Sequence, residues 1–221
     1  MSETRTRIKI CGITNSDDAR AAIAFGADAL GFIVVDESPR FVPPETVRQI
    51  VANVPPFVAK VAVIRDWHDC LDAPPGLYDV FQYYTANHSD KEDDNWNGAF
   101  PPRRVRAYRV KDRESFEEIE RTYREASAIL LDTYHKDKLG GSGETFNWDL
   151  AVEAKARFDA PLILAGGLTP DNVEEAIARV RPFAVDVSTG VEAEPGRKDH
   201  AKLKAFIRAV RQADTVFDRG W

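Results

Sequence analysis

Two residues of this sequence can act together as a base and an acid. Cys11 and Asp132 each follow a short run of β-branched and aliphatic residues of the kind that forms a buried strand. A thiolate can take a proton from carbon and a carboxylic acid can give one to oxygen, each accelerating a reaction by roughly 10²- to 10⁴-fold. Each residue also has a structural interpretation, because a buried cysteine packs as a small hydrophobic side chain and an aspartate often caps a turn.

Two glycine-containing turns predict a phosphate-binding site. Gly166 and Gly167 follow the next-to-last apolar run, and Ser188, Thr189 and Gly190 follow the last one. Glycine lets backbone N–H groups approach an anion closely, and N–H groups at the start of a short helix add to the attraction. The alternative is that both segments are ordinary tight turns. A phosphorylated substrate is the favoured interpretation.

Arg40 and Gln82 are candidate substrate-binding residues. Arg40 follows Ser38-Pro39 in a loop, and its guanidinium can hold a carboxylate through two parallel hydrogen bonds. It can equally be a solvated loop charge of little energetic value. Gln82 stands near the end of a predicted strand. The glycine-rich loop over residues 133–146 can close over a ligand or serve as an ordinary surface loop.

The elements that position these residues alternate between short strands and longer amphipathic helices, which is typical of parallel βαβ units. Asn15 or Ser16 can cap the first helix, which Gly26 ends, and Pro43-Pro44 introduces the second. Residues 88–102 are predicted to be a polar connection. The predicted strands are 7–10, 29–35, 57–64, 79–83, 104–109, 128–131, 161–165 and 184–187, and further helices are predicted at 67–76, 113–125, 150–158, after 169–170 and at 199–213.

Eight such repeats without a linker predict an α/β fold, a single (β/α)8 TIM barrel domain over residues 1–221. A doubly wound open sheet is the alternative, but it usually has fewer strands, and no glycine-rich nucleotide fingerprint follows Ile10. Catalytic groups of a barrel stand at the carboxyl ends of its strands. With strands one and six on opposite sides of the barrel, Cys11 and Asp132 are predicted to face each other across a substrate.

Composition excludes several classes of protein. The chain has 221 residues, 43% of them hydrophobic, and a net charge of −6, which argues against a nucleic-acid binder. Two cysteines are too few for a disulfide scaffold or a Cys-rich zinc module, and the four histidines show no metal-binding spacing. No signal peptide and no run of 18 apolar residues is present, so we expect a cytoplasmic protein with no membrane segment and no metal.

Nine short motifs follow one another along the chain between about residue 8 and residue 199. They are Lys9-Ile10-Cys11-Gly12-Ile13-Thr14, Gly26-Ala27-Asp28-Ala29-Leu30-Gly31-Phe32, Ser38-Pro39-Arg40-Phe41-Val42, Leu130-Leu131-Asp132-Thr133, Gly140-Gly141-Ser142-Gly143, Phe146-Asn147-Trp148, Leu164-Ala165-Gly166-Gly167-Leu168, Asp186-Val187-Ser188-Thr189-Gly190-Val191-Glu192 and Pro195-Gly196-Arg197-Lys198-Asp199. In these motifs, which occur in family order and are specific as a set, the chain resembles the phosphoribosylanthranilate isomerase family of tryptophan biosynthesis.

The resemblance implies an Amadori rearrangement of N-(5-phosphoribosyl)anthranilate to 1-(2-carboxyphenylamino)-1-deoxyribulose 5-phosphate. Asp132 is then the general acid that opens the ribose ring, and Cys11 is the base that removes the C2 proton. Arg40 holds the anthranilate carboxylate, and the two glycine turns bind the phosphate. No cofactor is implied, because the substrate nitrogen is the electron sink. A nearby positive charge such as Lys9 is expected to favour the Cys11 thiolate.

Two segments depart from the family pattern. The fourth strand usually ends in Gln-Leu-His-Gly, whereas this chain has Gln82-Tyr83-Tyr84-Thr85, and the third ends in Val63-Ile64-Arg65-Asp66 instead of Val-Phe-Val-Asn. Residues 86–100 are also unlike the family. These changes leave two alternatives, a barrel enzyme for another phosphorylated sugar and a non-catalytic barrel that binds a phosphate ligand. The sequence leaves open whether the protein is a monomer or a homodimer.

Overall fold

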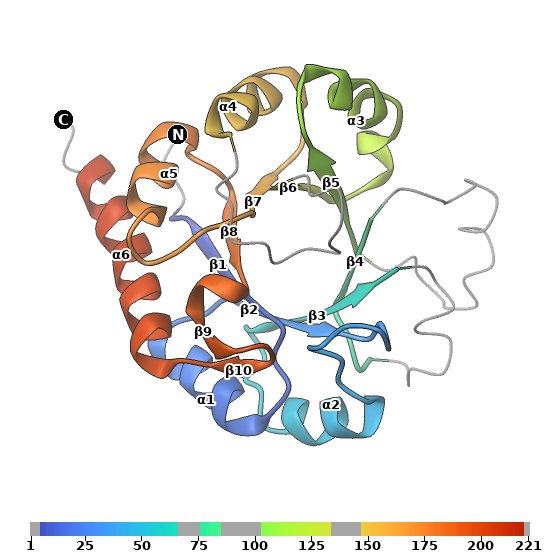
Figure 1. Cartoon of the computed structure of the whole chain (residues 1–221), viewed down its shortest axis with the longest axis vertical. Coiled ribbons are helices and arrows are strands. Elements are labelled where there is room, and N and C mark those ends of the chain that lie inside the picture. The colour runs from blue at the N-terminus through green and yellow to red at the C-terminus, as the bar shows by residue number, and fades with distance from the viewer. Residues whose placement is uncertain (1–4, 66–75, 85–102, 134–146, 219–221) are drawn as a thin grey trace.

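Eight parallel strands close into a barrel in the order β1 to β8, with β8 pairing back onto β1 (Figure 1). This confirms the predicted (β/α)8 barrel. The computed structural model describes residues 5–65, 76–84, 103–133 and 147–218. The strands are β1 Arg7–Cys11, β2 Ala29–Ile33, β3 Ala59–Ile64, β4 Val80–Tyr84, β5 Arg103–Val110, β6 Ala128–Thr133, β7 Leu162–Leu164 and β8 Ala184–Val187.

The helices lie outside the ring of strands (Figure 1). Of the two predicted candidates, Asn15 and not Ser16 caps the first helix, since the Asn15 side chain accepts a bond from the Asp18 N–H at 2.9 Å. Gly26 ends the helix as predicted, with a φ of 110°. The second helix begins at Pro44. The bounds are α1 Ser16–Phe25, α2 Pro44–Val51, α3 Phe116–Thr122, α4 Trp148–Arg157, α5 Val173–Val180 and α6 His200–Asp218.

The continuous helix predicted over residues 113–125 is wrong in detail. The segment divides into a 3-10 turn at Arg113–Ser115, the short helix α3, and a second 3-10 turn at Tyr123–Glu125. At the break, the Thr122 hydroxyl donates to the Glu118 carbonyl at 2.8 Å. A threonine that bonds back onto its own helix competes with the regular backbone pattern. The predicted helix at 67–76 lies outside the described residues, as do the connection at 88–102 and most of the glycine-rich loop.

Alternating residues of each strand face two different cores. Outward side chains such as Ile8, Leu30 and Phe81 pack against the helices, whereas a smaller cluster including Ala107 and Leu130 fills the barrel. This follows from the period of two along a strand. The same alternation assigns Lys9, Gln82 and Asp186 to the barrel interior, and all three are buried. The interior is therefore partly polar.

A small antiparallel hairpin follows β8 and was not predicted. After a 3-10 turn at Thr189–Val191, strand β9, Glu192–Glu194, pairs with β10, Arg197–Lys198. Gly196 between them has a φ of 80°, which favours glycine. Three-residue and two-residue strands give too short an alternation to be recognised in a sequence. The hairpin brings Glu192 and Lys198 next to the carboxyl end of β1.

Candidate active site

The predicted chemical groups lie at the carboxyl ends of the barrel strands. Cys11 ends β1, Asp132 is the next-to-last residue of β6, and Ser188 directly follows β8. Strands β7 and β8 separate β6 from β1 on the shorter way around the ring. Cys11 and Asp132 therefore lie at the same mouth of the barrel, as predicted. The prediction that their strands lie on opposite sides is wrong, because β5, and not β6, is opposite β1 in a closed ring of eight strands.

Each oxygen of the Asp132 carboxyl accepts a hydrogen bond. Its Oδ1 accepts the Thr133 N–H at 2.8 Å, and its Oδ2 accepts the Tyr84 hydroxyl at 2.9 Å. Burial raises the pKa of Asp132 above its ordinary value, although the bonds from Tyr84 and Thr133 act in the opposite direction. A raised pKa suits a group that must carry a proton to give away.

Cys11 is a free, buried thiol that is 6% exposed. Gly31 on the neighbouring strand leaves room for it, since a Cβ there would lie 2.9 Å from the Cys11 Sγ and 3.1 Å from the Lys9 Cε. Burial raises the pKa of Cys11, while the Lys9 and Lys198 charges lower it by less. Lys9 thus favours the thiolate as expected, but burial outweighs it.

The Lys9 charge is shared with a second partner inside the barrel. Its Nζ donates to the Asp186 Oδ1 at 2.9 Å, and both side chains are buried. Lys9 and Asp186 are paired residues of β1 and β8, the two strands that close the barrel. The ion pair therefore lies inside the barrel, two residues before Cys11 along β1. Burial lowers the pKa of Lys9, but the charges of Asp186 and Cys11 more than reverse this and keep it protonated.

Arg40 extends from the loop after β2 to the hairpin on β8. Its Nε and Nη2 bind the two oxygens of Glu192 at 2.9 and 2.7 Å, and Nη2 also reaches the Thr189 hydroxyl at 3.4 Å. These bonds use one edge of the planar guanidinium, and within the described residues no hydrogen bond uses Nη1. Gly12 makes this path possible, because a Cβ there would lie 2.8 Å from the Arg40 Cδ. That Arg40 binds a substrate carboxylate stays a prediction.

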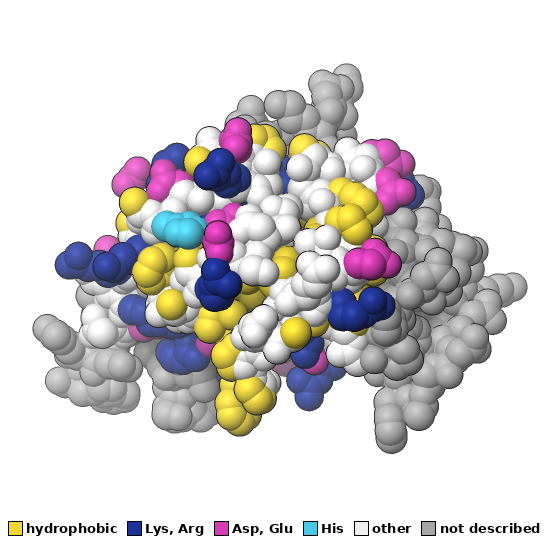
Figure 2. Space-filling view, turned by 90° about the horizontal axis from the view of Figure 1, so that it is seen from below, with side chains coloured by type: hydrophobic (Ala, Val, Ile, Leu, Met, Phe, Trp, Pro, Cys, Tyr) yellow, Lys and Arg dark blue, Asp and Glu magenta, His cyan; other side chains and the backbone are white. Residues whose placement is uncertain are grey.

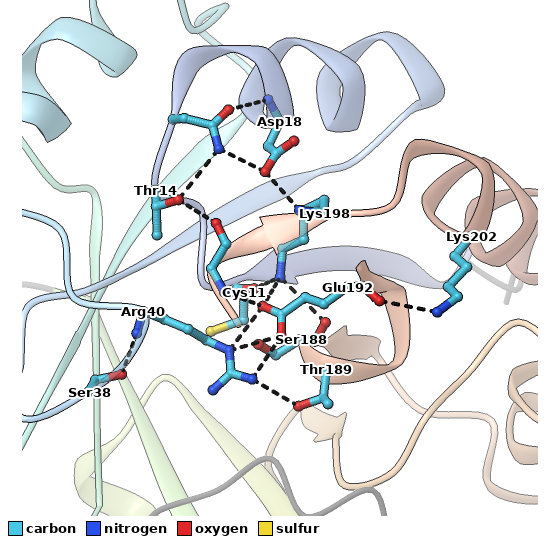
Figure 3. A network of polar contacts seen from close by, with 12 residues as sticks. Cys11, Thr14, Asp18, Ser38, Arg40, Ser188, Thr189, Glu192, Lys198 and Lys202 are labelled. Atoms are coloured by element: carbon cyan, nitrogen blue, oxygen red, sulfur yellow. Dashed lines mark hydrogen bonds and ion pairs between the residues drawn. The ribbon is translucent and has the colours of Figure 1, made fainter. Parts of the chain in front are cut away.

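Lys198 connects the hairpin to the carboxyl ends of β1 and β8 (Figure 3). Its fully buried Nζ donates to the Cys11 carbonyl at 2.6 Å, to the Ser188 carbonyl at 3.4 Å and to Glu192 at 2.9 Å. Burial raises the pKa of Glu192, but the bonds from Arg40 and Lys198 outweigh it and hold the carboxylate ionised. Two cations and one anion therefore form a buried network around the end of β1.

The two glycine turns lie together, as predicted. A Cβ on Gly190 would overlap the Leu168 carbonyl oxygen, so the turn after β8 packs tightly on the loop after β7. Gly166 and Gly167 have φ values of 83° and 65°, and within the described residues no hydrogen bond uses their N–H groups. The buried Ser188 hydroxyl likewise has no partner in that part of the chain. The donors that a phosphate needs are thus available.

Gln82 lies deeper than predicted. It is 2% exposed, inside the barrel and below Tyr84 on the same strand, and its Oε1 has no partner among the described residues. Its role in substrate binding stays a prediction. Asp149, another acid near the motifs, is exposed in the first turn of α4 and binds Arg179 of α5 at 2.6 Å. Glu144 lies outside the described residues.

Sequence reasoning did not assign roles to Tyr84, Arg109, Asp186 or Lys198. The period of two along a strand could have revealed the first three, because each occupies the inward phase of its strand, as Cys11 and Asp132 do. Lys198 belongs to the unpredicted hairpin and gives no such signal. Within the described residues, no group of three or more His, Cys, Asp or Glu side chains is placed to hold a metal ion, and no helix is both long and apolar enough to cross a bilayer.

The sequence of this chain matches a known family along most of its length. Residues 8–209 match the model of the N-(5′-phosphoribosyl)anthranilate isomerase family. The protein of that name from Geobacter sulfurreducens is 48% identical over 93% of this chain and 98% of its own length. The Pseudomonas fluorescens protein is 46% identical over the same shares.

Solved structures agree with these matches. Phosphoribosyl anthranilate isomerase from Thermotoga maritima superposes with a TM-score of 0.83 at 39% identity, covering 94% of this chain and 99% of that one. A structure of a phosphoribosyl anthranilate isomerase in complex with reduced 1-(o-carboxyphenylamino)-1-deoxyribulose 5-phosphate has a TM-score of 0.80 at 38% identity, with the same coverage.

Proposed function

This chain belongs to the N-(5′-phosphoribosyl)anthranilate isomerase family, an enzyme family of tryptophan biosynthesis, and we propose that Asp132 and Cys11 carry out an Amadori rearrangement at the mouth of its barrel. The observation that carries this assignment is the Asp132 carboxyl. It stands at the strand ends with its pKa raised, in the same mouth as the buried Cys11 thiol. Two groups placed in this way can divide an acid step and a base step between them.

The acid step opens the ribose ring. Asp132 transfers its proton to the ring oxygen as the bond from C1 to that oxygen breaks, and the nitrogen lone pair forms the C1–N double bond of a protonated Schiff base. The base step follows at C2. Cys11 removes the C2 proton, and the C–H electron pair forms a C1–C2 double bond while the iminium electrons return to nitrogen. The resulting enolamine then tautomerises to the ketone. The substrate nitrogen accepts the electrons, so we propose that no metal or organic cofactor takes part.

Burial of Cys11 makes the base step depend on its neighbours. A buried thiol ionises with difficulty, and the cations Lys9 and Lys198 offset part of that cost. The iminium formed in the first step adds a further positive charge next to C2. We therefore propose that the thiolate forms after the ring has opened. This order keeps a nucleophilic thiolate from accumulating in the free enzyme.

The two ends of the substrate are anchored on opposite sides of the reacting carbons. The Gly166-Gly167 turn, with Ser188, Thr189 and Gly190, provides backbone and hydroxyl donors for the phosphate. Arg40 offers its Nη1 edge to the anthranilate carboxylate, with its other edge fixed by Glu192. A ligand with both groups, bound to a 38% identical relative, supports this assignment.

The test is a steady-state fluorescence assay with freshly generated N-(5-phosphoribosyl)anthranilate, comparing the wild type with Cys11→Ala and Asp132→Asn. We expect each variant to lose at least about 10³-fold in kcat, since each removes the group that we propose as the proton donor or acceptor of one step. An Asp149→Asn variant, altered at an exposed carboxylate outside the site, is the matched control and keeps wild-type turnover. Full activity of Cys11→Ser would refute the role of Cys11. Folded, phosphate-binding wild type without turnover would point to another phosphorylated sugar.

We propose that the protein forms a homodimer. A phosphoribosylanthranilate isomerase from Thermotoga maritima, 36% identical to this chain, is described as dimeric. Here Phe57 is 97% exposed beside the exposed Pro55 and Pro56. Figure 2 shows that hydrophobic side chains reach the surface among Lys and Arg side chains on one face of the molecule. Sedimentation velocity of the wild type and of Phe57→Ser tests this proposal, with a dimer expected for the first and a monomer for the second.

We also propose a cytoplasmic location. A functional Cys11 thiol must stay reduced, and the cytoplasm keeps thiols reduced. Cell fractionation followed by the activity assay checks this location.

A further inference from the structure

The proposed acid, Asp132, has a hydrogen-bond partner that takes no part in the acid and base steps described above. The Tyr84 hydroxyl donates to Oδ2 of Asp132 at 2.9 Å, from two strands away. We propose that Tyr84 is a positioning residue that orients the Asp132 carboxyl and exchanges donor and acceptor roles with it during the acid step. This inference rests on the proposed function, because it assumes that Asp132 is the acid.

Tyr84 is itself held in place. The Arg109 guanidinium lies 4.6 Å from the centre of the Tyr84 ring, a cation–π contact. Arg109 is on β5, between β4 and β6 (Figure 1), and its register partner on β6 is Asp132. The three side chains come from the adjacent strands β4, β5 and β6. Arg109 contacts the Tyr84 ring, and the Tyr84 hydroxyl orients the Asp132 carboxyl.

The backbone determines which carboxyl oxygen carries the proton. The Thr133 N–H can only donate, so Oδ1 stays an acceptor whether Asp132 is charged or neutral. The proton of the neutral acid then resides on Oδ2, next to Tyr84. When Oδ2 gives this proton to the ring oxygen, the Tyr84 O–H turns to donate to the new carboxylate. Burial, followed by the Asp132 charge, raises the pKa of Tyr84 well above its ordinary value, so the phenol keeps its own proton.

The charges around this pair come from several strands. The Asp186 charge on β8 raises the pKa of Asp132, and the Arg109 charge on β5 lowers it. Asp186 is itself paired with Lys9 on β1. The Cys11 charge on β1 raises the pKa of Tyr84, after burial and Asp132. Within the described residues, β7 contributes no charge, and Gly166 after it packs against the carboxyl, where a Cβ would lie 3.1 Å from Oδ1. Among the side chains that the structure describes, the one that hydrogen-bonds Asp132 is that of Tyr84.

The test compares Tyr84→Phe with the wild type across pH. Phenylalanine keeps the ring over Arg109 and removes only the hydroxyl. Tyr108→Phe is the matched control, because it removes a hydroxyl that bonds Thr122 at 2.9 Å on the outer side of the same sheet. We expect the plateau kcat of Tyr84→Phe to fall about tenfold, as for a misoriented catalytic group, with KM within about twofold.

The pH profile separates positioning from a merely structural effect. The Tyr84 bond favours the ionised carboxylate, so its removal raises the pKa of Asp132. The alkaline limb of the kcat profile, and the midpoint of the Asp132 carboxyl followed by carbon NMR in the free enzyme, should both move to higher pH. Tyr108→Phe should leave both unchanged.

Two results would overturn the inference, and they differ. If Asp132→Asn is inactive but Tyr84→Phe shows the wild-type profile and the wild-type NMR midpoint, Tyr84 does not position the acid and the proposed function stands. If Asp132→Asn retains activity, the role of Asp132 fails and the inference fails with it.

Discussion

The Glu192 carboxylate binds two cations at once, Arg40 and Lys198. One Glu192 oxygen accepts the buried Lys198, whose ammonium also binds the Cys11 carbonyl, and both oxygens accept the edge of Arg40. A guanidinium without this partner would rotate among several rotamers and lose entropy each time it bound a carboxylate. Under the proposed function, Arg40 is already ordered by Glu192 before a substrate carboxylate binds.

Glu192→Gln should therefore weaken substrate binding more than chemistry. A neutral amide matches only one of the Arg40 donors, so we expect KM to rise about tenfold, or about 1.4 kcal/mol, with kcat within about twofold. Lys198 loses its buried counter-ion, and the free energy of unfolding should fall by about 3 kcal/mol. Steady-state kinetics and urea unfolding measure these effects.

The control for Glu192→Gln is Glu194→Gln, on the same hairpin. Glu194 is exposed, and its ion pair with Arg197 is long at 3.7 Å. Both KM and the unfolding midpoint should stay at wild-type values. A Glu192→Gln enzyme with an unchanged KM would show that Arg40 needs no preorganisation or does not bind the substrate.

At the scale of the elements, the contact between the turns after β7 and β8 is set by the absence of a side chain at Gly190. We expect Gly190→Ala to weaken the binding of inorganic phosphate at least about tenfold, because the added methyl displaces the Leu168 carbonyl and separates the two turns. Isothermal titration calorimetry measures the affinity.

Gly76→Ala is the matched control for the Gly190→Ala titration. Gly76 precedes β4 at the other end of the barrel, with a φ of 79°, and a Cβ added there would meet nothing within 4 Å. The variant should lose about 1 kcal/mol of stability through backbone strain and keep its phosphate affinity. Equal affinities for all three proteins would place the phosphate elsewhere.

The sequence predicted all eight strands and the ends that carry Cys11 and Asp132, because long apolar runs separated by capped helices are strong local signals. β8 was predicted with its observed bounds, and α1 with both caps. The β9–β10 hairpin was missed because its strands are too short to show an alternation. The break at Thr122 was missed because hydrophobic periodicity does not reveal a side chain that bonds the backbone of its own helix. The Arg40–Glu192 pair and the bond from Lys198 to the Cys11 carbonyl were missed because their members are 152 and 187 positions apart in the sequence.

At the scale of the whole molecule, the Lys9–Asp186 pair lies at the seam where the barrel closes. Lys9→Met leaves a buried carboxylate unpaired, and we expect it to lower the free energy of unfolding by about 3–5 kcal/mol. The double variant Lys9→Met, Asp186→Leu should recover most of that loss, because it buries neither charge. Urea unfolding of the two single variants and the double variant measures the coupling. A double variant as unstable as the sum of the singles would mean that the pair does not act as a unit.

The bond from Lys198 to the Cys11 carbonyl also has a temporal consequence. The two residues are 187 positions apart, so at a synthesis rate of about 10 residues per second the ribosome adds Lys198 roughly 20 s after Cys11. During that interval Cys11 is present in the nascent chain, but Lys198, which binds the Cys11 carbonyl at the end of β1, is not. Nascent chains arrested before and after Lys198 should accordingly differ in how fast an alkylating reagent labels Cys11, with the longer chain protected.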